Sequence, residues 1–494
     1  MVDIRDALSY DDVLLLPGAS SVLPRDTVIS TELAPGLSLR TPVLSAAMDR
    51  VTEASMAIAM ARQGGLGVIH KNCSVEDQAA MVESVKRSES GFISDPVTLT
   101  ADDPVQRSFD LMARYRVSGF PVVDGQRKLV GIVTNRDLRN GADPDRPVRD
   151  YMTSTGLATA APGTTLEQAR DAMQAARVEK LPIVDADGRL TGMFTFKDIE
   201  KVRRYPHSAK DASGRLLVAA AIGASHDGDE RAEALVRAGV DLLAIDSAHG
   251  HSAGILEFAG KIKDRFPDTP LMVGNVATAD GARACADHGA DVVKVGVGPG
   301  SICTTRIVTG VGVPQFTAVV DAAEAAADAG VTAIADGGIR YSGDIVKALA
   351  AGAAAVMVGN LLAGTDESPG ELVLVGGRRY KEYRGMGSTD AMRAGSADRY
   401  FQGSTPGAAD EGPTKLVPEG VSGLLPYRGS VGEVVEQLAG GLRSGMGYVG
   451  AANLGELVSR ARFVKQSAAG ARESHVHDMD VVHEAPNYQV PGKG

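Results

Sequence analysis

Cysteine is scarce in this chain, which has only Cys73, Cys285 and Cys303 among 494 residues. An odd number of widely separated cysteines excludes the disulfide framework of a small secreted domain. The sequence also lacks the paired CxxC spacing that is typical of a structural zinc site. We therefore expect each of the three thiols to act alone.

Long apolar runs and dense basic runs are missing as well. Apolar stretches such as LLVAAAIGA, residues 216–224, are far too short to cross a membrane. The first residues, MVDIRDALSYDD, lack the apolar segment of a signal peptide. The net charge is −11, from 51 Lys and Arg against 62 Asp and Glu. We expect a cytoplasmic protein with neither a membrane nor a nucleic acid as partner.

Tryptophan is absent and aromatic residues make up 4% of the chain, whereas Ala, Val and the 58 glycines are abundant. Such a composition favours parallel strands that alternate with helices. The chain is also too long for one ordinary domain, but a barrel of about 250 residues with an inserted module would account for its length. We expect two domains.

The chain contains an internal repeat. GFPVVDGQRKLVGIVTNRDL, residues 119–138, and KLPIVDADGRLTGMFTFKDI, residues 180–199, align without gaps at an offset of 61. Each copy predicts a helix, a strand, a turn, a second strand and a Thr-x-x-Asp helix start. The pair resembles two CBS domains, which in many proteins bind adenine or guanine nucleotides in a shared cleft. The resemblance implies ribose contacts by Asp137 and Asp198; the alternative is that both only cap helices.

Polar stretches flank the repeat at residues 86–96 and 203–215, so the pair interrupts a larger domain. We expect that domain to comprise residues 1–91 and 207–494, with CBS domains at 92–147 and 148–206.

The larger domain shows a second pattern, in which short apolar runs end in a polar or glycine-rich corner every 25 to 35 residues or so. The runs are LLAIDSAHG (242–250), LMVGNVAT (271–278), VVKVGVGPG (292–300), AIADGGI (333–339) and AAVMVGN (354–360). This spacing predicts successive βα units with parallel strands buried on both faces. A doubly wound sheet would give the same local pattern, but functional-looking residues after every strand favour a closed (β/α)8 TIM barrel.

A closed barrel would gather these corners at one rim. They are Asp246, Asn275, the 298–305 loop, Asp336 and Gly359. Glycine corners let backbone N–H groups approach phosphate oxygens, and a carboxylate such as Asp336 can accept both hydroxyls of a ribose. Asp336 can equally serve to stabilise a turn. The rim is therefore suited to a ligand that bears hydroxyls and phosphate.

Cys303 lies in the sequence GVGPGSICTTR, between a glycine-rich turn and Thr304-Thr305-Arg306. Backbone dipoles in such a loop favour the thiolate, which is the nucleophilic form. Cys285 lies within a helical pattern and Cys73 in an ordinary context, so both are expected to fill space. From its local sequence alone, Cys303 is equally a nucleophile or a packing residue.

Longer motifs resolve this alternative. GVGPGSICTTR, ADGGIRYSGD, YRGMGS, DRYFQ, KLVPEG and ESHVHDM occur in this order, with YDDVLLLPG near the start and EAPNYQ near the end. Together they resemble the inosine-5′-monophosphate (IMP) dehydrogenases of the IMP dehydrogenase / GMP reductase family, over essentially the full length. The resemblance implies that a cysteine attacks C2 of IMP, that hydride passes to NAD, and that the covalent xanthosine monophosphate (XMP) adduct is hydrolysed.

The resemblance also implies roles for individual residues. The catalytic set is Cys303, Thr305, Arg399, Tyr400 and Glu419, with Arg399 and Tyr400 in a mobile flap at about 388–420. The substrate set is Ser301, Asp336, Gly338, Gly359, Asn360, Tyr383, Gly385, Met386, Gly387 and Glu419. The NAD set is Asp246, Ser247, Asn275, Gly296 and Gly298. A potassium ion is implied on carbonyls of Gly298, Gly300 and Cys303 and, from a neighbouring subunit of a homotetramer or octamer, of Glu473, Ser474 and His475.

Several positions depart from the family pattern. Asn360 stands where serine is usual, Ala248 replaces a second serine after Asp246, Arg50 replaces threonine, and Thr389-Asp390 replaces Leu-Gly. Two alternatives to a dehydrogenase also remain, a GMP reductase and a non-catalytic nucleotide sensor. The 31 residues between Gly387 and Glu419 include DRYFQ and favour the dehydrogenase.

Overall fold

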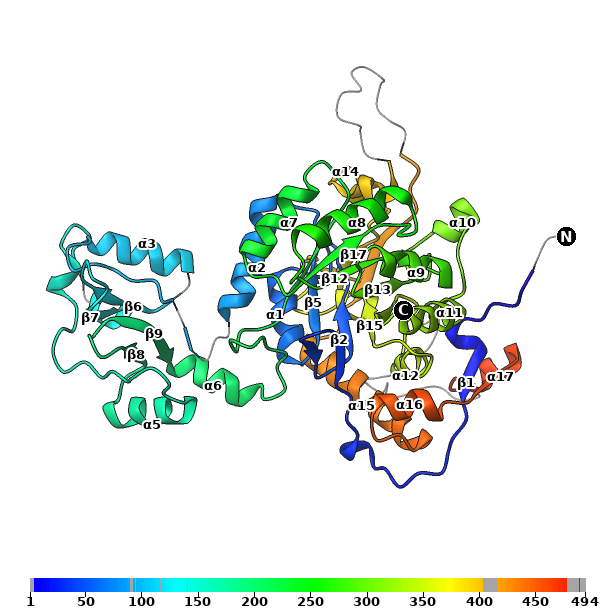
Figure 1. Ribbon diagram of the computed structural model, residues 1–494, viewed down its shortest axis with the longest axis horizontal. Helices are drawn as coiled ribbons and strands as arrows, with labels where there is room; N and C mark the ends of the chain where they lie inside the picture. Colours follow the sequence, from blue (N-terminus) through cyan, green and yellow to red (C-terminus); the bar gives the residue numbers. More distant parts are fainter. Residues whose placement is uncertain are drawn as a thin grey trace, which may run out of the picture. The chain divides into compact units, whose positions relative to one another are not determined.

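The computed structural model describes residues 4–88, 92–93, 95–115, 117–139, 141–402, 416–477 and 488, without the side chains of residues 197–198 and 201–202 (Figure 1). The chain divides into two compact units. One comprises Met1–Ser88, His207–Asp211 and Leu216–Gly494, and the other comprises Glu89–Pro206 and Ala212–Arg215. The second unit is thus inserted into the chain of the first.

The first unit is built on a closed barrel of parallel strands, which confirms the predicted (β/α)8 fold. Around the barrel the order is β10-β11-β12-β13-β14-β15-β4-β5. Their bounds are β4 Val43–Ser45, β5 Leu66–Ile69, β10 Ala219–Ile222, β11 Leu242–Asp246, β12 Leu271–Val276, β13 Val292–Val295, β14 Thr332–Asp336 and β15 Ala355–Val358. The barrel closes where β15 pairs with β4 and β5 pairs with β10, so the chain on either side of the insertion contributes to one sheet.

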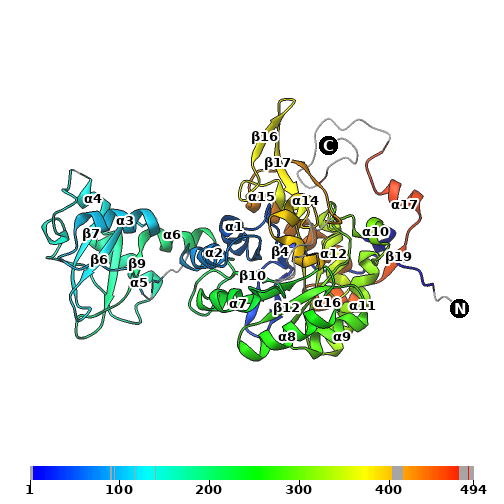
Figure 2. The same ribbon diagram turned by 90° about the horizontal axis from the view of Figure 1, so that it is seen from above.

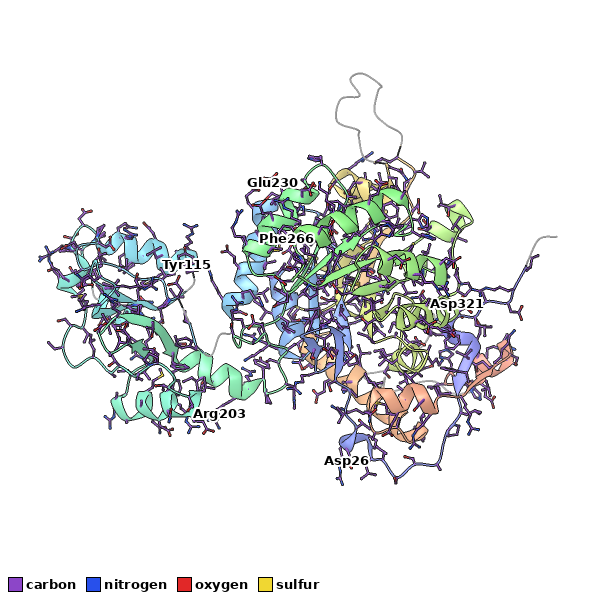
Figure 3. The ribbon with its side chains drawn as sticks, in the orientation of Figure 1. Asp26, Tyr115, Arg203, Glu230, Phe266 and Asp321 are labelled. Atoms are coloured by element: carbon purple, nitrogen blue, oxygen red, sulfur yellow. The ribbon has the colours of Figure 1, made fainter. Side chains whose placement is uncertain are left out.

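Helices cover the outside of the strands, as Figures 1 and 2 show. They are α1 Ala54–Arg62, α2 Val75–Ser88, α7 Gly228–Arg237, α8 Ala253–Arg265, α9 Ala279–Asp287, α11 Gln315–Asp328, α12 Ser342–Ala350 and α15 Val431–Val449. Each presents an apolar face to the strands, while polar residues such as Glu230 on α7 face solvent (Figure 3).

Two apolar clusters account for the abundance of alanine and valine. Inside the barrel, small residues such as Ala219, Ala221 and Ala244 pack with Met272 and Ile334. The alternate residues of the same strands, such as Ala220 and Ile222, belong to a second cluster between strands and helices. This alternation buries every strand on both faces, as expected for a parallel barrel.

The first unit also contains shorter elements outside the barrel strands. The antiparallel sheet β16 Leu372–Val375, β17 Arg378–Arg384 and β18 Ser422–Pro426 follows β15 and the short helix α13 Asn360–Ala363. Between β17 and β18 lie α14 Thr389–Arg393 and the 3-10 turn η4 Ser396–Tyr400, while α10 Thr305–Thr309 follows the Cys303 loop. Near the chain ends, β1 Val13–Leu15 pairs with β19 Phe463–Lys465, and β2 Thr31–Ala34 pairs with β3 Leu37–Leu39; α16 Leu454–Arg460 and α17 Ala468–Glu473 flank β19.

The inserted unit shows its repeat in structure. The first copy forms α3 Val105–Tyr115, β6 Gly119–Val123, β7 Leu129–Thr134 and α4 Asn135–Leu138, and the second forms α5 Leu166–Ala176, β8 Lys180–Val184, β9 Leu190–Thr195 and α6 Phe196–Arg204. Both hairpins have the same register, with Gly119 opposite Thr134 and Lys180 opposite Thr195, and an irregularity at the same place. Within the described residues, no helix has the length and apolar character needed to span a membrane.

Candidate active site

The carboxyl ends of the barrel strands bring together most of the residues that the sequence singled out. Asp246 ends β11, Asn275 lies in β12, Asp336 ends β14 and the Cys303 loop follows β13. They line a cavity of about 130 Å³, together with Thr305, Met386, Gly387, Arg399, Tyr400 and Glu419. Catalytic, substrate and cofactor candidates therefore share one small space.

A chain of three polar side chains runs through this cavity. The Cys303 Sγ lies 3.1 Å from Thr305 Oγ1, and the Thr305 hydroxyl donates a 2.8 Å hydrogen bond to Glu419 Oε2. The backbone holds them in place, since the Thr304 N–H donates to the Glu419 carbonyl at 2.9 Å and Cys303 pairs with Gly420. A thiol, a hydroxyl and a carboxylate at these separations form a path along which a proton can move.

The other two thiols lie in different surroundings. Cys285 is fully buried in α9, and burial raises the pKa of its thiol to about 12. Burial also raises the pKa of Cys73 to about 11. Neither thiol yields much thiolate near neutral pH, which agrees with the packing role expected for both.

Residues of η4 cover the cavity. The Arg399 guanidinium forms an ion pair with the Asp246 carboxylate, and the Arg399 carbonyl accepts a 3.0 Å hydrogen bond from the Ala248 N–H. The Tyr400 ring lies against Gly387, where an added Cβ would come within 2.9 Å of ring atoms. Burial raises the pKa of Tyr400, although Arg399 counteracts this shift. Residues 403–415 of the expected flap lie outside the described residues.

Lys294 is a residue of the site that the sequence did not reveal. It is 1% exposed, and its Nζ donates to Asp246 Oδ1 at 2.7 Å and to Asp336 Oδ2 at 3.0 Å. It also donates to Asn275 Oδ1, while Asn275 Nδ2 donates to Asp336 Oδ2 at 2.8 Å. Lys294 and Arg399 thus balance the buried carboxylate of Asp246 and the half-buried carboxylate of Asp336. The available signal was a lysine within the apolar run VVKVG, because a charge in a buried strand requires partners.

A second cavity, of about 340 Å³, adjoins the first and contains the predicted phosphate residues. It is lined by Ser301, Gly338, Gly359, Asn360 and Tyr383, and also by Ser9, Tyr10 and Asp11, which the sequence did not suggest. Asn360 Nδ2 donates a 3.1 Å hydrogen bond to Ser301 Oγ. Burial raises the pKa of Tyr383 and keeps its phenol a donor, and an added Cβ at Gly359 would lie 2.9 Å from the Tyr383 oxygen. Ser301, Asn360 and Tyr383 can donate to an anion, and the lining of this cavity also includes Arg306 and Arg340.

The remaining predicted residues lie at several places. Ser247 follows Asp246 and donates its N–H to the Gly274 carbonyl at 2.9 Å, and Gly385 lines the first cavity together with Met386 and Gly387. Gly296 and Gly298 have φ of 152° and 77°, and an added Cβ at Gly296 would clash with the Asp336 carbonyl at 2.2 Å. Glu473 ends α17, with Ser474 and His475 after it. Among the described residues, no group of three His, Cys, Asp or Glu could hold a metal ion.

The inserted unit has a cavity of its own, of about 460 Å³, lined by Ser118, Thr134, Asp137, Lys180 and others. Asp137 Oδ2 accepts 2.7 Å hydrogen bonds from the Thr134 N–H and hydroxyl, so it caps α4. The side chain of Asp198 lies outside the described residues.

Two of the departures from the family pattern have visible surroundings. Arg50 lies 3.9 Å from the Glu382 carboxylate, so its charge has a partner at the surface of β17. Thr389 and Asp390 open α14, which Ser388 caps by accepting a hydrogen bond from the Ala391 N–H. An acidic residue suits the first turn of a helix.

Comparison with known proteins agrees with this geometry. The sequence matches the family described as "IMP dehydrogenase / GMP reductase domain" over residues 7–477. The chain belongs to the IMP dehydrogenase / GMP reductase family. It is similar to inosine-5′-monophosphate dehydrogenase of Streptococcus pyogenes, with 56% identity over 489 residues that cover 99% of this chain and 98% of the relative. The protein of the same name from Aquifex aeolicus is 55% identical, with 99% and 98% covered.

A solved structure of the family has the same fold. It is a cysteine-to-alanine variant of GMP reductase from Trypanosoma brucei in complex with guanosine 5′-monophosphate, with a TM-score of 0.87 and 40% identity. The match covers 97% of this chain and 99% of the other. The resemblance to the family that the motifs indicated is confirmed, and fold alone does not separate the two activities within it.

Proposed function

We propose that this protein is an NAD-dependent IMP dehydrogenase, which oxidises IMP to XMP through a covalent adduct on Cys303. The observation that carries the proposal is the Cys303–Thr305–Glu419 chain, with Arg399 and Tyr400 covering the same cavity. A nucleophile alone would suit either activity of the family, whereas a proton path together with a polar cover suits an adduct that water must hydrolyse.

The reaction has two stages. The Cys303 sulfur forms a bond to C2 of the purine, and the hydrogen on C2 leaves as a hydride, which bound NAD accepts. Water then forms a bond to C2 and loses a proton, and the C2–S bond breaks with its electron pair returning to sulfur. We assign the water proton to the path through the Thr305 hydroxyl to the Glu419 carboxylate, 2.8 Å apart.

Arg399 has an electrostatic part in this scheme. A guanidinium group stays protonated in proteins, so it is better suited to orient water and stabilise developing hydroxide than to accept a proton. Tyr400, next to it and largely enclosed, excludes bulk water from the adduct.

The substrate fits the two adjoining cavities. We assign the phosphate to Ser301, Gly338, Gly359, Asn360 and Tyr383, whose donors surround the second cavity, and the ribose hydroxyls to Asp336. Gly385, Met386, Gly387 and Glu419 then face the base in the first cavity. Asn360 keeps an N–H donor at a position where the family usually has a hydroxyl.

NAD and potassium fit separate parts of the same loop system. Asp246 and Ser247 suit the nicotinamide ribose, with Asn275, Gly296 and Gly298 beside the ring, because a carboxylate that ends a strand can accept both ribose hydroxyls. Carbonyls of Gly298, Gly300 and Cys303 suit a weakly bound hard cation. We propose that Glu473, Ser474 and His475 of a second subunit complete the cation site in a homotetramer.

A second, regulatory function is proposed for the inserted unit. Its cavity combines carboxylate, hydroxyl and cationic side chains, which suits a nucleotide at Asp137. By the resemblance to CBS domains, we propose the same role for Asp198 in the second repeat. This assignment concerns effectors and leaves the reaction at Cys303 unchanged.

The test is an assay of the purified chain with IMP, NAD and potassium. We expect stoichiometric NADH and XMP, stimulation by potassium, and no turnover by a Cys303→Ala variant that retains the wild-type circular dichroism spectrum. Consumption of NADPH with GMP and release of ammonia would instead make the protein a GMP reductase. Absence of turnover with either substrate pair would favour the non-catalytic sensor.

A further inference from the structure

We propose that Lys71 is a positioning residue for the hydrolytic step, because its ammonium group holds Asp398 and thereby fixes the orientation of the adjacent Arg399. Neither Lys71 nor Asp398 belongs to the set of residues to which a role has been assigned above. The inference rests on the proposed dehydrogenase function and adds to it the group that sets the water-orienting cation in place.

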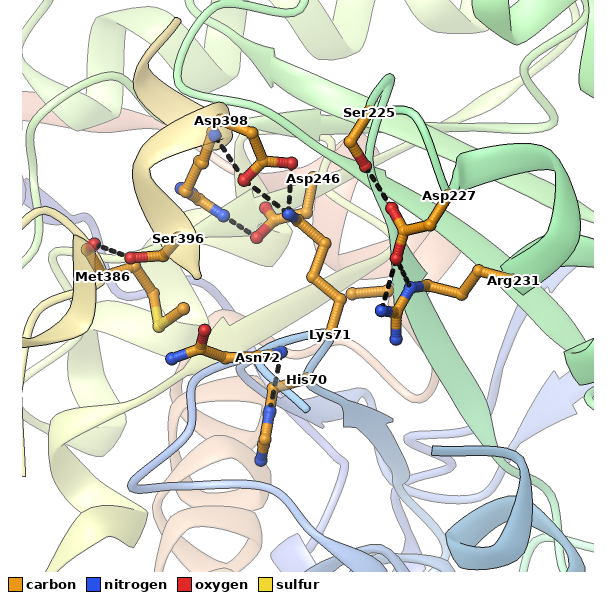
Figure 4. A network of polar contacts seen from close by, with 12 residues as sticks. His70, Lys71, Asn72, Ser225, Asp227, Arg231, Asp246, Met386, Ser396 and Asp398 are labelled. Carbon is orange, nitrogen blue, oxygen red and sulfur yellow. Dashed lines mark hydrogen bonds and ion pairs between the residues drawn. The ribbon is translucent and has the colours of Figure 1, made fainter. Parts of the chain in front are cut away.

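The first observation is an enclosed ion pair at the barrel rim. Lys71 follows β5, and its Nζ lies 2.6 Å from Asp398 Oδ1 and 2.5 Å from Asp398 Oδ2. Figure 4 shows this contact between Lys71 and Asp398. The side chains are 10% and 25% exposed, so water screens the pair only weakly. An exposed lysine pair would contribute little, whereas removal of one partner from an enclosed pair leaves an uncompensated charge.

The second observation links this pair to Arg399. Asp398 Oδ1, which Lys71 contacts, also accepts a 2.8 Å hydrogen bond from the Arg399 N–H. The Arg399 carbonyl in turn accepts from the Ala248 N–H, and its guanidinium reaches Asp246. The backbone of Arg399 is therefore fixed by hydrogen bonds on both sides, one of them made by a carboxylate that Lys71 holds.

The third observation is the close packing beneath the pair. An added Cβ at Gly223, after β10, would lie 3.0 Å from both Lys71 Cε and Asp398 Oδ2. Beside it, Asn72 packs against Gly395, where an added Cβ would come within 2.7 Å of Asn72 Oδ1. Asn72 is itself anchored, since its Nδ2 donates to Asp49 Oδ2 at 2.7 Å. Residues 71 and 72 thus pack closely against η4 and the residue before it, and Asn72 is hydrogen-bonded to Asp49.

The charges on the two sides of this contact are complementary. The η4 turn carries adjacent Asp398 and Arg399, and the rim presents Lys71 and Asp246, so each charge meets its opposite. The reverse arrangement would place Asp398 beside Asp246 and Arg399 beside Lys71, so that like charges would meet. Repulsion between like charges therefore favours a single orientation of the turn. Lys71 therefore sets the orientation of Arg399 toward the cavity.

The experiment compares the full-length enzyme with Lys71→Met and Asp398→Asn. Rapid mixing with IMP and NAD measures the NADH burst, which reports hydride transfer, and steady-state turnover reports hydrolysis. We expect a burst rate within about twofold of wild type and turnover reduced about 10- to 100-fold, by analogy with the loss of one partner of an enclosed pair. Mass spectrometry of the quenched protein should show the Cys303 adduct accumulating.

Three controls separate positioning from general damage. Lys71→Arg retains the cation and should recover most of the turnover. The double variant should be no slower than the slower single variant, because the two residues act through one contact. Lys261→Met removes a 2.5 Å pair with Asp229 that is exposed on helices α7 and α8, and it should leave both rates unchanged.

Several outcomes would overturn the inference. Equal losses in burst and turnover, additive effects in the double variant, or a raised KM for NAD with normal hydrolysis would each do so. If Lys71→Met does not fold, Asp398→Asn decides the matter by the same readouts. An inactive wild-type enzyme refutes the dehydrogenase proposal, whereas an active one unaffected at Lys71 and Asp398 refutes only the positioning role.

Discussion

At the scale of single residues, the site depends on charges that are buried but paired. Lys294 is nearly inaccessible and lies between Asp246 and Asp336, the carboxylates assigned to the cofactor and substrate riboses. Without its cation these two carboxylates would repel each other in a region of low dielectric constant. We therefore expect this lysine to couple the two proposed binding sites.

We predict that Lys294→Met lowers the free energy of unfolding by about 3 to 5 kcal/mol, the usual effect of removing one partner from a buried ion pair. IMP and NAD binding should both weaken, because Asp246 and Asp336 lose a common donor. Urea unfolding and titration calorimetry measure these effects. A variant of normal stability that loses affinity for only one ligand would contradict the coupling.

The three thiols should differ in their reactivity with iodoacetamide. At pH 7.5, Cys73 and Cys285 are protonated because burial raises their pKa values to about 11 and about 12. We predict that peptide mapping finds Cys303 modified first, with loss of activity and protection by IMP. Because this pH range lies below the raised pKa of Cys73, the fraction of its thiol present as thiolate increases about tenfold per pH unit. Labelling of Cys73 should therefore increase about tenfold per pH unit between pH 7.5 and 9.5. Equal labelling of all three thiols at pH 7.5 would contradict the burial of Cys73 and Cys285.

At the scale of elements, the antiparallel sheet that follows β15 positions Glu419 next to Cys303 and Thr305. Strand β18 pairs with β17, and the segment before it brings Glu419 to Thr305, which lies 114 residues earlier. The segment has little free space, because an added Cβ at Gly387 would lie 2.9 Å from Tyr400 and 3.0 Å from the Glu419 backbone. Gly387 therefore allows Tyr400 and the Glu419 backbone to approach the same point closely.

We predict that Gly387→Ala displaces Tyr400 and Glu419 and slows turnover at least tenfold. Gly423→Ala, in β18, is the matched control, because an added Cβ there meets no atom of the described residues within 4 Å. Steady-state assays and thermal unfolding of both variants separate a local effect from loss of the fold. Similar activity of the two variants would show that the contact at Gly387 is adaptable.

The sequence predicted elements best where strands were long and apolar. The five runs from residue 242 onward correspond to β11 to β15, but β4, with three residues, and β5, which contains glycine, give too short a pattern to recognise. Rim residues such as Asp246 and Asp336 were identified because they directly follow such runs. Lys294 was not, since its partners lie on neighbouring strands, and Arg399 and Glu419 depended on family resemblance because their contacts with Asp246 and Thr305 are distant in sequence.

At the scale of the whole molecule, the barrel and the inserted unit have separate cores. The segments that flank the insertion in sequence are held within the barrel unit, because Lys86 Nζ contacts Asp211 Oδ2 at 3.0 Å and the Ala209 N–H donates to the Ala61 carbonyl at 2.8 Å. These contacts do not involve residues of the inserted unit.

We predict that replacing residues 89–206 with a short Gly-Ser linker leaves a folded barrel whose turnover stays within about threefold of the full chain, since no active-site residue is removed. Responses to adenine or guanine nucleotides should disappear. Circular dichroism and the NADH assay provide the measurement. Loss of folding in the shortened chain would mean that the inserted unit stabilises the barrel.

The pairing of β1 with β19 has a consequence for synthesis on the ribosome. Val13 lies opposite Lys465, so β1 finds its partner only when nearly the whole chain has emerged. Strand β4 can pair with β5 early, but its other edge waits for β15 at residues 355–358. At about 5 to 20 residues per second, the first strand waits roughly 20 to 90 seconds. Meanwhile the inserted unit has both of its repeats available and can fold first. Strand β1 and the free edge of β4 therefore stay unpaired longest, and chaperones that bind unpaired apolar segments would act on them.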